Sequence, residues 1–555
     1  MMRRAFIAGA LAAALGLAAC IDRLASGGDA TEAGNARLSG VVLGEDSLPV
    51  SGVEVVILPS DFDPLTAGPV PESLKVTTDS HGQYRFLSLA AGEYNVLAHD
   101  GAGRGRLAIW GVRLESDSVK VPADTLHATG SLSIPLPETL DSDSGWIYVP
   151  GTLLRARINS ELRLAGKVRI DSVPAGTIPI IACARGPGGP ALLLAKNVLV
   201  RKAQVSPVDA YALWPYSRKV LLNTATGATA LAHDLRDFPL LVRLAAPAFD
   251  FSQAGSGGSD LRFSAADGTP LAREIESWDP VAGKAAVWVR LDTLHAGQAD
   301  QYVNMHWGPS PAAGTMGGRA VFDTLAGFAA VWHLGEEAPD TIANALYKDI
   351  TGAGSDGDDR IANTSSEGII GAGHGLDSGD YIVSPRPSGG LRVSNAFTLS
   401  AWFRANGKKL GLMGGEILSV GDNYGIRVLR DSGLQFWYWT VKPQPATPAT
   451  WNYLIAKTPT VLDGRWHSIM GAFDGSFLRV FLDGHEVGQI AATGAVGPQF
   501  PLNVTLGRHG SGRPGFEFSG ALDEAEIHSV ARDGEWAKLS FENQMPASVF
   551  PAFGL

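Results

Sequence analysis

The segment Phe518-Ser-Gly-Ala-Leu-Asp-Glu-Ala-Glu-Ile527 closes a pattern that begins at Ala330-Val-Trp-His-Leu-Gly335 and fills the last third of the chain. Between these segments, short runs of alternating apolar residues are interrupted at regular intervals by Gly, Asp or Pro. Alternation with a period of two indicates half-buried strands, and regularly spaced turn residues indicate antiparallel connections. The stretch from Ala330 to Met545 therefore predicts an antiparallel β-sandwich.

Composition extends this prediction to the rest of the chain. With 555 residues the protein is too long for one hydrophobic core. Glycine (67) and proline (33) are frequent, only 18% of the residues are charged, and long helical patterns are absent after residue 20. We therefore expect an all-β chain of several β-sandwiches. The net charge of -11 and the lack of a basic run argue against nucleic acid or anionic lipid as a partner.

The N-terminus has the form of a secretory signal. Two arginines precede the small apolar run 5–19, which is too short to span a bilayer comfortably. The run ends in Leu17-Ala-Ala-Cys20, which resembles the bacterial lipobox and implies a signal peptide at 1–19, a lipid on Cys20 and a polar tether at 20–36. An ordinary signal peptide cut nearby is the alternative. Ile21 after the cysteine favours the outer membrane of the bacterial envelope.

Two small β modules are expected next. Pro49-Val-Ser-Gly-Val-Glu-Val-Val-Ile57 places Val53, Val55 and Ile57 on one buried face. With Thr77-Thr-Asp-Ser-His-Gly-Gln-Tyr84 it resembles the carboxypeptidase regulatory-like (Cna-B or transthyretin-like) sandwich, which implies a spacer at 37–125. Residues 126–208 predict a second small module. It contains Cys183, which we interpret as a small buried hydrophobic residue.

The following region carries Asp260-Leu-Arg-Phe263, Glu274-Ile-Glu-Ser-Trp-Asp279 and Ala286-Val-Trp-Val-Arg-Leu291. These motifs, in this order, resemble domain-of-unknown-function family 2341 and imply such a β domain at 209–325. No biochemistry accompanies the resemblance.

The C-terminal stretch carries Phe397-Thr-Leu-Ser-Ala-Trp-Phe403, Asp463-Gly-Arg-Trp-His-Ser468 and Gly520-Ala-Leu-Asp-Glu-Ala-Glu-Ile527. It resembles the LamG-like jelly roll of the concanavalin A-like lectin/glucanase superfamily, which implies a domain at 326–545 and a tail at 546–555. Asp533 to Asn543 predicts a short helix that packs on this sandwich.

A calcium site is the first candidate for chemistry. LamG-like domains often bind a cation through the early Asp strand and the closing Asp-Glu strand, and Asp380 and Asp523 match those positions. Calcium needs six to eight oxygen ligands, so carbonyls and waters would complete the shell. Further carboxylates lie at Asp356, Asp358 and Asp359. The alternative is that Asp523 bonds backbone amides while the loop acids are solvated.

Aromatic residues provide a second candidate, a carbohydrate-binding surface. In a strand, Trp437 and Trp439 face one way and Phe436 and Tyr438 the other, so one pair belongs to the core. The ligand-binding candidates are Trp437, Trp439, Trp451 and Tyr453, whose rings would stack on sugar. Core or inter-domain packing is the alternative.

Catalysis is the third candidate. Glucanases of this superfamily use paired carboxylates in Glu-x-Asp-x-x-Glu, and the nearest sequence here is Asp523-Glu-Ala-Glu526. Ala521 stands where the first glutamate is needed, so we expect no enzyme activity. The sequence predicts a lipid-anchored surface binding or adhesion protein that recognises carbohydrate or a protein partner, with calcium as a candidate cofactor. A surface polysaccharide hydrolase and a ligand-free structural envelope protein are the alternatives.

Overall fold

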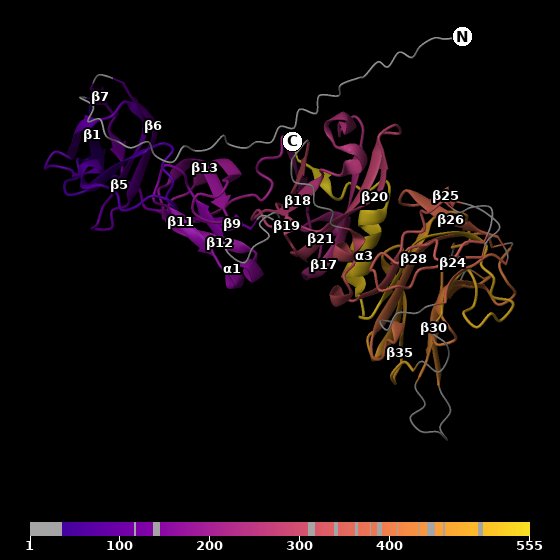
Figure 1. Ribbon diagram of the computed structural model, residues 1–555. Coiled ribbons are helices and arrows are strands. Elements are labelled where there is room, and N and C mark those ends of the chain that lie inside the picture. Colours follow the sequence, from indigo (N-terminus) through magenta and orange to yellow (C-terminus); the bar gives the residue numbers. More distant parts are fainter. Residues whose placement is uncertain are drawn as a thin grey trace, which may run out of the picture. The chain divides into compact units, whose positions relative to one another are not determined.

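The computed structural model describes residues 36–115, 118–136, 145–308, 317–337, 342–360, 365–377, 379–385, 391–407, 409–431, 433–440, 450–458, 461–497 and 503–554 (Figure 1). The predicted signal peptide, Cys20 and nearly all of the tether lie outside these residues. Strands dominate, which confirms the all-β prediction. The chain divides into two compact units, one up to Leu213 together with Asp267–Thr269 and one from Trp214 onward.

The first unit contains two main hydrophobic cores and a small further cluster of Leu65, Tyr148, Ala182 and Ala184. Around the first core, one sheet pairs β4, β1, β7 and β8 and the other pairs β3, β2, β5 and β6. Val53, Val55 and Ile57 are fully buried as predicted. The strands are β1 (Ala36–Leu43), β2 (Glu54–Pro59), β3 (Lys75–Thr77), β4 (Gln83–Leu89), β5 (Gly92–His99), β6 (Arg106–Leu114), β7 (Val119–Lys120) and β8 (Asp124–Thr125).

The second core of this unit lies between sheets of order β11-β10-β13-β14 and β12-β9-β15. Cys183 belongs to this core, and burial raises the pKa of its thiol to about 12, so it is an inert apolar residue as predicted. The elements are β9 (Gly130–Pro135), β10 (Gly145–Tyr148), β11 (Arg155–Ile158), α1 (Ser160–Ala165), β12 (Lys167–Val173), β13 (Gly176–Ala184), β14 (Leu192–Val200) and β15 (Val205–Pro207).

The second unit begins with a five-stranded sheet, β19-β18-β22-β16-β38, and a three-stranded sheet, β17-β21-β20. β38 comes from the predicted tail, because residues 552–553 pair with β16. The elements are β16 (Tyr216–Leu221), β17 (Leu235–Ala245), β18 (Arg262–Ala265), β19 (Pro270–Leu271), β20 (Arg273–Asp279), β21 (Lys284–Leu294), β22 (Tyr302–Trp307), α2 (Gly318–Val321) and β38 (Ala552–Phe553).

Two larger antiparallel sheets form the predicted C-terminal sandwich. The eight-stranded sheet contains β23 (Phe328–Trp332), β25 (Ser365–Glu367), β26 (Ala372–Leu376), β28 (Phe397–Ala405), β33 (His467–Phe473), β34 (Phe477–Leu482), β35 (His485–Ala491) and β37 (Gly520–His528). The seven-stranded sheet contains β24 (Asp358–Asp359), β27 (Ile382–Ser384), β29 (Gly415–Val420), β30 (Tyr424–Val428), β31 (Gly433–Trp439), β32 (Trp451–Lys457) and β36 (Val504–Leu506).

The predicted helix is present as α3 (Gly534–Gln544), and the side chain of Asp533 caps it by accepting the Trp536 N–H at 3.0 Å. Trp536 and Leu539 of α3 are buried against strand β17 and the eight-stranded sheet, whose outer face contributes Trp402 and Phe481 to the same core. The ribbon shows α3 beside β17 (Figure 1). The helix therefore joins the sandwich to the preceding sheets. Sequence patterns missed α1 and α2, which are only one to two turns long.

Single-turn 3-10 helices complete the described secondary structure at Glu72–Leu74, Gly227–Thr229, Phe251–Gln253, Ser256–Gly258 and Thr324–Ala326. Among the helices in the described ranges, none has both the length and the apolar character needed to cross a membrane.

Candidate functional site

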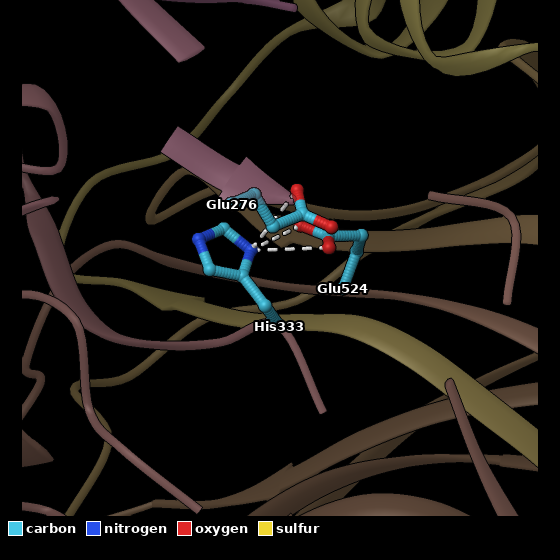
Figure 2. A group of neighbouring side chains, drawn as sticks. All are labelled: Glu276, His333 and Glu524. Atoms are coloured by element: carbon cyan, nitrogen blue, oxygen red, sulfur yellow. Dashed lines mark hydrogen bonds and ion pairs between the residues drawn. The ribbon is translucent and has the colours of Figure 1, made fainter. Parts of the chain in front are cut away.

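The side chains of Glu276, His333 and Glu524, each less than 10% exposed, form a cluster (Figure 2). The cluster lies where the three-stranded sheet meets the eight-stranded sheet. His333 Nδ1 lies 3.0 and 2.9 Å from the two carboxylate oxygens of Glu524, and 3.8 Å from Glu276 Oε2. One ligand atom from each residue lies within 4.8 Å of the others. We call these three residues the interface triad.

Irregularities in the strands direct these side chains toward one another. Glu276 lies on β20 at a register shift between Ile275 and Ser277. Glu524 lies at a bulge of β37, and its backbone φ of 47° is in the left-handed region. Bulges re-aim side chains out of the normal strand alternation. His333 directly follows the last residue of β23, which pairs with β37. The triad thus depends on local departures from regular strand geometry.

Further groups hold the triad in place. Glu274 Oε2 lies 3.5 Å from His333 Nε2, and the Trp288 indole N–H donates to Glu276 Oε2 at 2.6 Å. The rings of Trp288 and Phe322 pack against the imidazole, with centroids 6.0 and 5.5 Å away. Both nitrogens of His333 therefore face carboxylates within a mostly apolar shell.

Burial and the short distances between the charged groups shift the pKa values of all three residues of the triad. Burial raises the pKa of Glu276, and it raises the pKa of Glu524 well above its ordinary value. Burial lowers the pKa of His333, but the carboxylates of Glu524 and Glu276 outweigh it and hold that pKa well above the usual range. The cluster therefore favours a bound positive charge on or beside the imidazole.

The residues predicted to bind calcium have other roles here. Asp523 is fully buried, and its Oδ2 accepts the N–H groups of Ile369 and Ile370 at 2.7 and 3.1 Å, as the alternative interpretation expected. Asp380 Oδ2 accepts the Asp377 N–H at 2.9 Å in a turn. Within the described ranges, the three-residue group with metal-ligand geometry is the interface triad and includes neither aspartate. Calcium at Asp380 and Asp523 stays a prediction.

The loop acids are not all solvated, contrary to the alternative interpretation. Asp358 and Asp359 are buried in strand β24. Asp358 Oδ1 accepts the Ala345 N–H at 2.8 Å, and Arg360 pairs with its other oxygen at 2.7 Å. Asp356 is paired with Lys348 at 3.0 Å. Asp358 and Asp359 are buried because they form strand β24 of the seven-stranded sheet. The turn-like composition of this segment does not predict that strand.

Trp437 is in the interior, which corrects its prediction as a surface residue. It is 1% exposed, its ring stacks on His509 at 5.8 Å, and its N–H donates to Glu416 at 3.3 Å. The guanidinium of Arg427 lies over the same ring. The segment that carries His509 and Phe516 covers this part of the outer face of the seven-stranded sheet. Phe436 and Tyr438 are buried in the core between the sheets, as predicted for one of the pairs.

The other three predicted aromatic residues form a continuous group on edge strand β32 and its neighbour β31. Trp439 and Trp451 are cross-strand partners with stacked rings 6.2 Å apart, and the rings of Trp451 and Tyr453 stack at 4.4 Å. Trp451 and Tyr453 are 40% and 44% exposed. We call Trp439, Trp451 and Tyr453 the aromatic edge. The structure thus brings together three of the four candidates.

A separate polar cleft of about 900 Å³ lies at one end of the sandwich. Arg404, near the end of β28, lines this cleft. Its guanidinium lies over the ring of Trp466, 5.1 Å from the ring centroid. The other polar side chains on the cleft are Asp377, Asn406, Arg430, Asp463 and Ser519. Residues of this kind form hydrogen bonds to hydroxyl or carboxylate groups, so the cleft is a second surface suited to a polar ligand.

The carboxylates of the hydrolase alternative are buried. Glu524 is bound to His333, and Glu526 Oε2 lies 2.9 Å from His528 Nε2. Both are less than 10% exposed. Neither lies on the polar cleft or on the aromatic edge.

Family models match two parts of the chain. Residues 376–537 match the concanavalin A-like lectin/glucanases superfamily, and residues 257–334 match the domain of unknown function DUF2341. No curated protein matches the chain.

Three of the solved structures that match the chain are distantly similar to it. The binding domain of Paraclostridial Mosquitocidal Protein 1 is 13% identical over 39% of this chain and 52% of its own, with a TM-score of 0.30. The binding domain of Botulinum neurotoxin DC, solved with SialylT, is 11% identical over 40% and 52%, with a TM-score of 0.29. The chain thus spans about half the length of these two proteins. Domain 4 of the arabinanase AbnA from Geobacillus stearothermophilus, solved with arabinotriose, is 19% identical over 39% of this chain and 98% of its own, with a TM-score of 0.27.

Similarity at this level does not transfer a ligand to the present chain. The two family matches confirm the corresponding predictions from sequence, and each covers well under half of the protein. The chain therefore contains a DUF2341 domain followed by a C-terminal domain of the concanavalin A-like lectin/glucanase superfamily.

Proposed function

We propose that the protein is a binding protein of the bacterial surface whose C-terminal domain recognises carbohydrate through the aromatic edge. The observation that carries this proposal is the exposure of Trp451 and Tyr453 side by side on a domain of the lectin/glucanase superfamily. Aromatic faces pack on the C–H surfaces of pyranose rings while hydroxyl groups stay solvated. Large rings exposed together on a sheet edge are also typical of interaction surfaces.

Binding without hydrolysis is the activity that we propose. Glu524 and Glu526 are buried against histidines, so neither is positioned to protonate a glycosidic oxygen of a bound polysaccharide. Replacing either with glutamine tests the hydrolase alternative. A purified chain that cleaves polysaccharide, and loses turnover in these variants, would replace our proposal with that alternative.

Lipid attachment at Cys20 and location at the outer membrane are part of the proposal, supported by the lipobox-like Leu17-Ala-Ala-Cys20 and by Ile21. A chain held by two or more acyl groups stays stably on a membrane. We expect the wild-type protein in the membrane fraction, labelled by palmitate, and the Cys20→Ser variant unlabelled and unprocessed. Equal labelling of both would contradict the anchor.

Carbohydrate recognition is tested on a glycan array followed by titration calorimetry with the strongest hit. We expect Trp451→Ala and Tyr453→Ala to weaken binding by about 1–3 kcal/mol each, the magnitude known for nucleic-acid bases that stack on aromatic side chains. Tyr216→Ala is the matched control, because Tyr216 is 38% exposed and stacks on Trp307 in the other domain of the same unit.

The remaining outcomes of the array separate the alternatives. Binding that survives loss of the aromatic edge and is lost in Arg404→Ala would place the ligand in the polar cleft. A blank array would favour a protein partner, or the structural envelope protein without a ligand. Repeating the array with calcium, for the wild-type protein and for Asp380→Asn, tests the predicted cofactor. Asp523 is unsuitable as a probe because its side chain is needed for hydrogen bonds to backbone N–H groups.

A further inference from the structure

We propose that the interface triad, Glu276, His333 and Glu524, binds one divalent transition-metal ion such as Zn²⁺ or Mn²⁺. The three side chains come from β20, the residue after β23, and β37. Ligands of a tetrahedral ion at 2.0–2.1 Å are about 3.3 Å from one another. The measured separations between His333 Nδ1 and the carboxylate oxygens, 2.9 to 3.8 Å, bracket that value.

The charge of the surroundings supports a cation independently of this geometry. Glu274, Glu276, Asp523 and Glu524 are four carboxylates in one buried region, and His333 and Arg243 are the cationic groups that act on them. Arg243 donates to backbone carbonyls of Ile369, Asn543 and Gln544. When all six groups are ionised, the four carboxylates and two cations together carry a net charge of -2. Buried excess charge is neutralised by protons or by a metal ion.

The donor set selects the kind of ion. One imidazole nitrogen with two carboxylates suits Zn²⁺ or Mn²⁺, whereas Ca²⁺ takes six to eight oxygen ligands. Both oxygens of Glu524 lie at nearly equal distances from Nδ1, so this carboxylate can bind in a bidentate manner.

The residues around the triad have the arrangement that orients metal ligands. Glu274 lies 3.5 Å from His333 Nε2, in position to accept the Nε2–H, so that loss of the Nδ1 proton directs the Nδ1 lone pair at Glu276 and Glu524. Trp288 holds Glu276 through its indole N–H. Metal binding replaces the proton on Nδ1, so affinity increases as the pH rises.

The ion would connect the two domains of the second unit. Glu276 belongs to the DUF2341 domain, and Glu524 belongs to the closing strand of the lectin-like domain. An ion that binds only the folded arrangement stabilises it in proportion to the logarithm of its concentration. We therefore infer a structural role for the metal at this interface.

The test uses the full chain purified without chelator. We expect about one equivalent of Zn²⁺ or Mn²⁺ by mass spectrometry, and recovery of binding when either ion is added to the stripped protein. Glu276→Gln and Glu524→Gln should lose the metal. Glu274→Gln should weaken binding by about 10–100-fold, as is usual when an orienting partner is removed. Glu526→Gln is the matched control, because Glu526 pairs with a different buried histidine on the same strand.

A second readout does not depend on variants that could misfold. Wild-type protein loaded with Mn²⁺ should show, by pulsed electron paramagnetic resonance, coupling to the nitrogen of one histidine ring. Stripped protein that binds neither ion would overturn the proposal and leave a cluster neutralised by protons. A bound ion without nitrogen coupling, or retained fully by Glu524→Gln, would overturn it too. Trp451→Ala should keep the metal, so failure of carbohydrate recognition is separable from failure of this site.

Discussion

Glu524 combines backbone strain with a buried charge. Its φ of 47° costs a non-glycine residue roughly 1–2 kcal/mol. The carboxylate is 2% exposed and depends on His333 for its closest polar contacts. A strained residue persists only where its surroundings compensate, and such positions are concentrated at functional sites. This supports the interface triad as a functional feature rather than a packing accident.

The buried side chain of His374 predicts how the stability of the protein depends on pH. It is fully buried, hydrogen bonded to Tyr347 at 2.8 Å, and burial lowers its pKa from 6.5 to about 4. The folded state therefore favours the neutral ring, and this contribution to stability is complete above pH 6.5 and is lost as the pH falls toward 4. The shift corresponds to about 3 kcal/mol.

We expect His374→Gln to be less stable than wild type at pH 7 and to lose less stability between pH 7 and 4. Urea unfolding at each pH measures the difference, and parallel curves for the two proteins would contradict the assigned pKa. His485→Gln serves as the control because its side chain is exposed.

Helix α3 is the element that links the two domains of the second unit. Its buried face contributes Trp536, Ala537 and Leu539 to a core shared with β17 and the outer face of the eight-stranded sheet. At its end, the amide of Asn543 donates to the Leu241 carbonyl at 2.9 Å and accepts the Leu241 N–H at 2.7 Å. One side chain thus completes the backbone hydrogen bonding of β17 at this position.

Asn543→Ala should therefore destabilise the second unit. It leaves a buried N–H and a buried carbonyl without their partner, at a cost of about 1–3 kcal/mol each. Glu542→Ala, the preceding residue on the helix, should change stability by about 0.5 kcal/mol or less because it is only half-buried. Chemical denaturation of both variants measures this, and equal losses would show that the Asn543 contacts contribute little.

At the scale of the whole molecule, the two domains of the second unit share one hydrophobic core. The core that contains Phe238 and Trp288 continues into Trp402, Met470 and Phe481 of the lectin-like sheet. Both faces of β28 are consequently buried, which explains why its burial does not alternate along the strand. The DUF2341 match extends to residue 334, past the predicted boundary near residue 325, and a common hydrophobic core spans both matched domains.

We therefore expect a fragment that begins at Trp214 to unfold in one cooperative transition. A fragment of residues 326–555 exposes the outer face of its eight-stranded sheet, and it should bind hydrophobic dyes, aggregate or melt at least several degrees lower. Differential scanning calorimetry with dye binding checks both fragments. A monomeric 326–555 fragment with the melting temperature of the longer one would show that the shared core is dispensable.

The sequence by itself determined the strands, the all-β class and the order of the two matched domains. Alternation along Phe397–Phe403 and turn residues between strands are local properties of the chain, as is the capped helix after Asp533. Family motifs added the resemblance to DUF2341 and to the lectin-like fold. Burial of Cys183 also followed from local pattern, as did burial of one of the two aromatic pairs, which the structure identifies as Phe436 with Tyr438.

Tertiary structure alone decided which of these residues meet. Glu276, His333 and Glu524 are far apart in the chain, and two of them are directed inward by bulges that strand periodicity does not encode. Trp437 is buried because the distant His509 covers it, while Trp451 and Tyr453 are exposed because β32 is an edge strand. Period-two patterns specify which residues share a face, but long-range packing determines what covers that face.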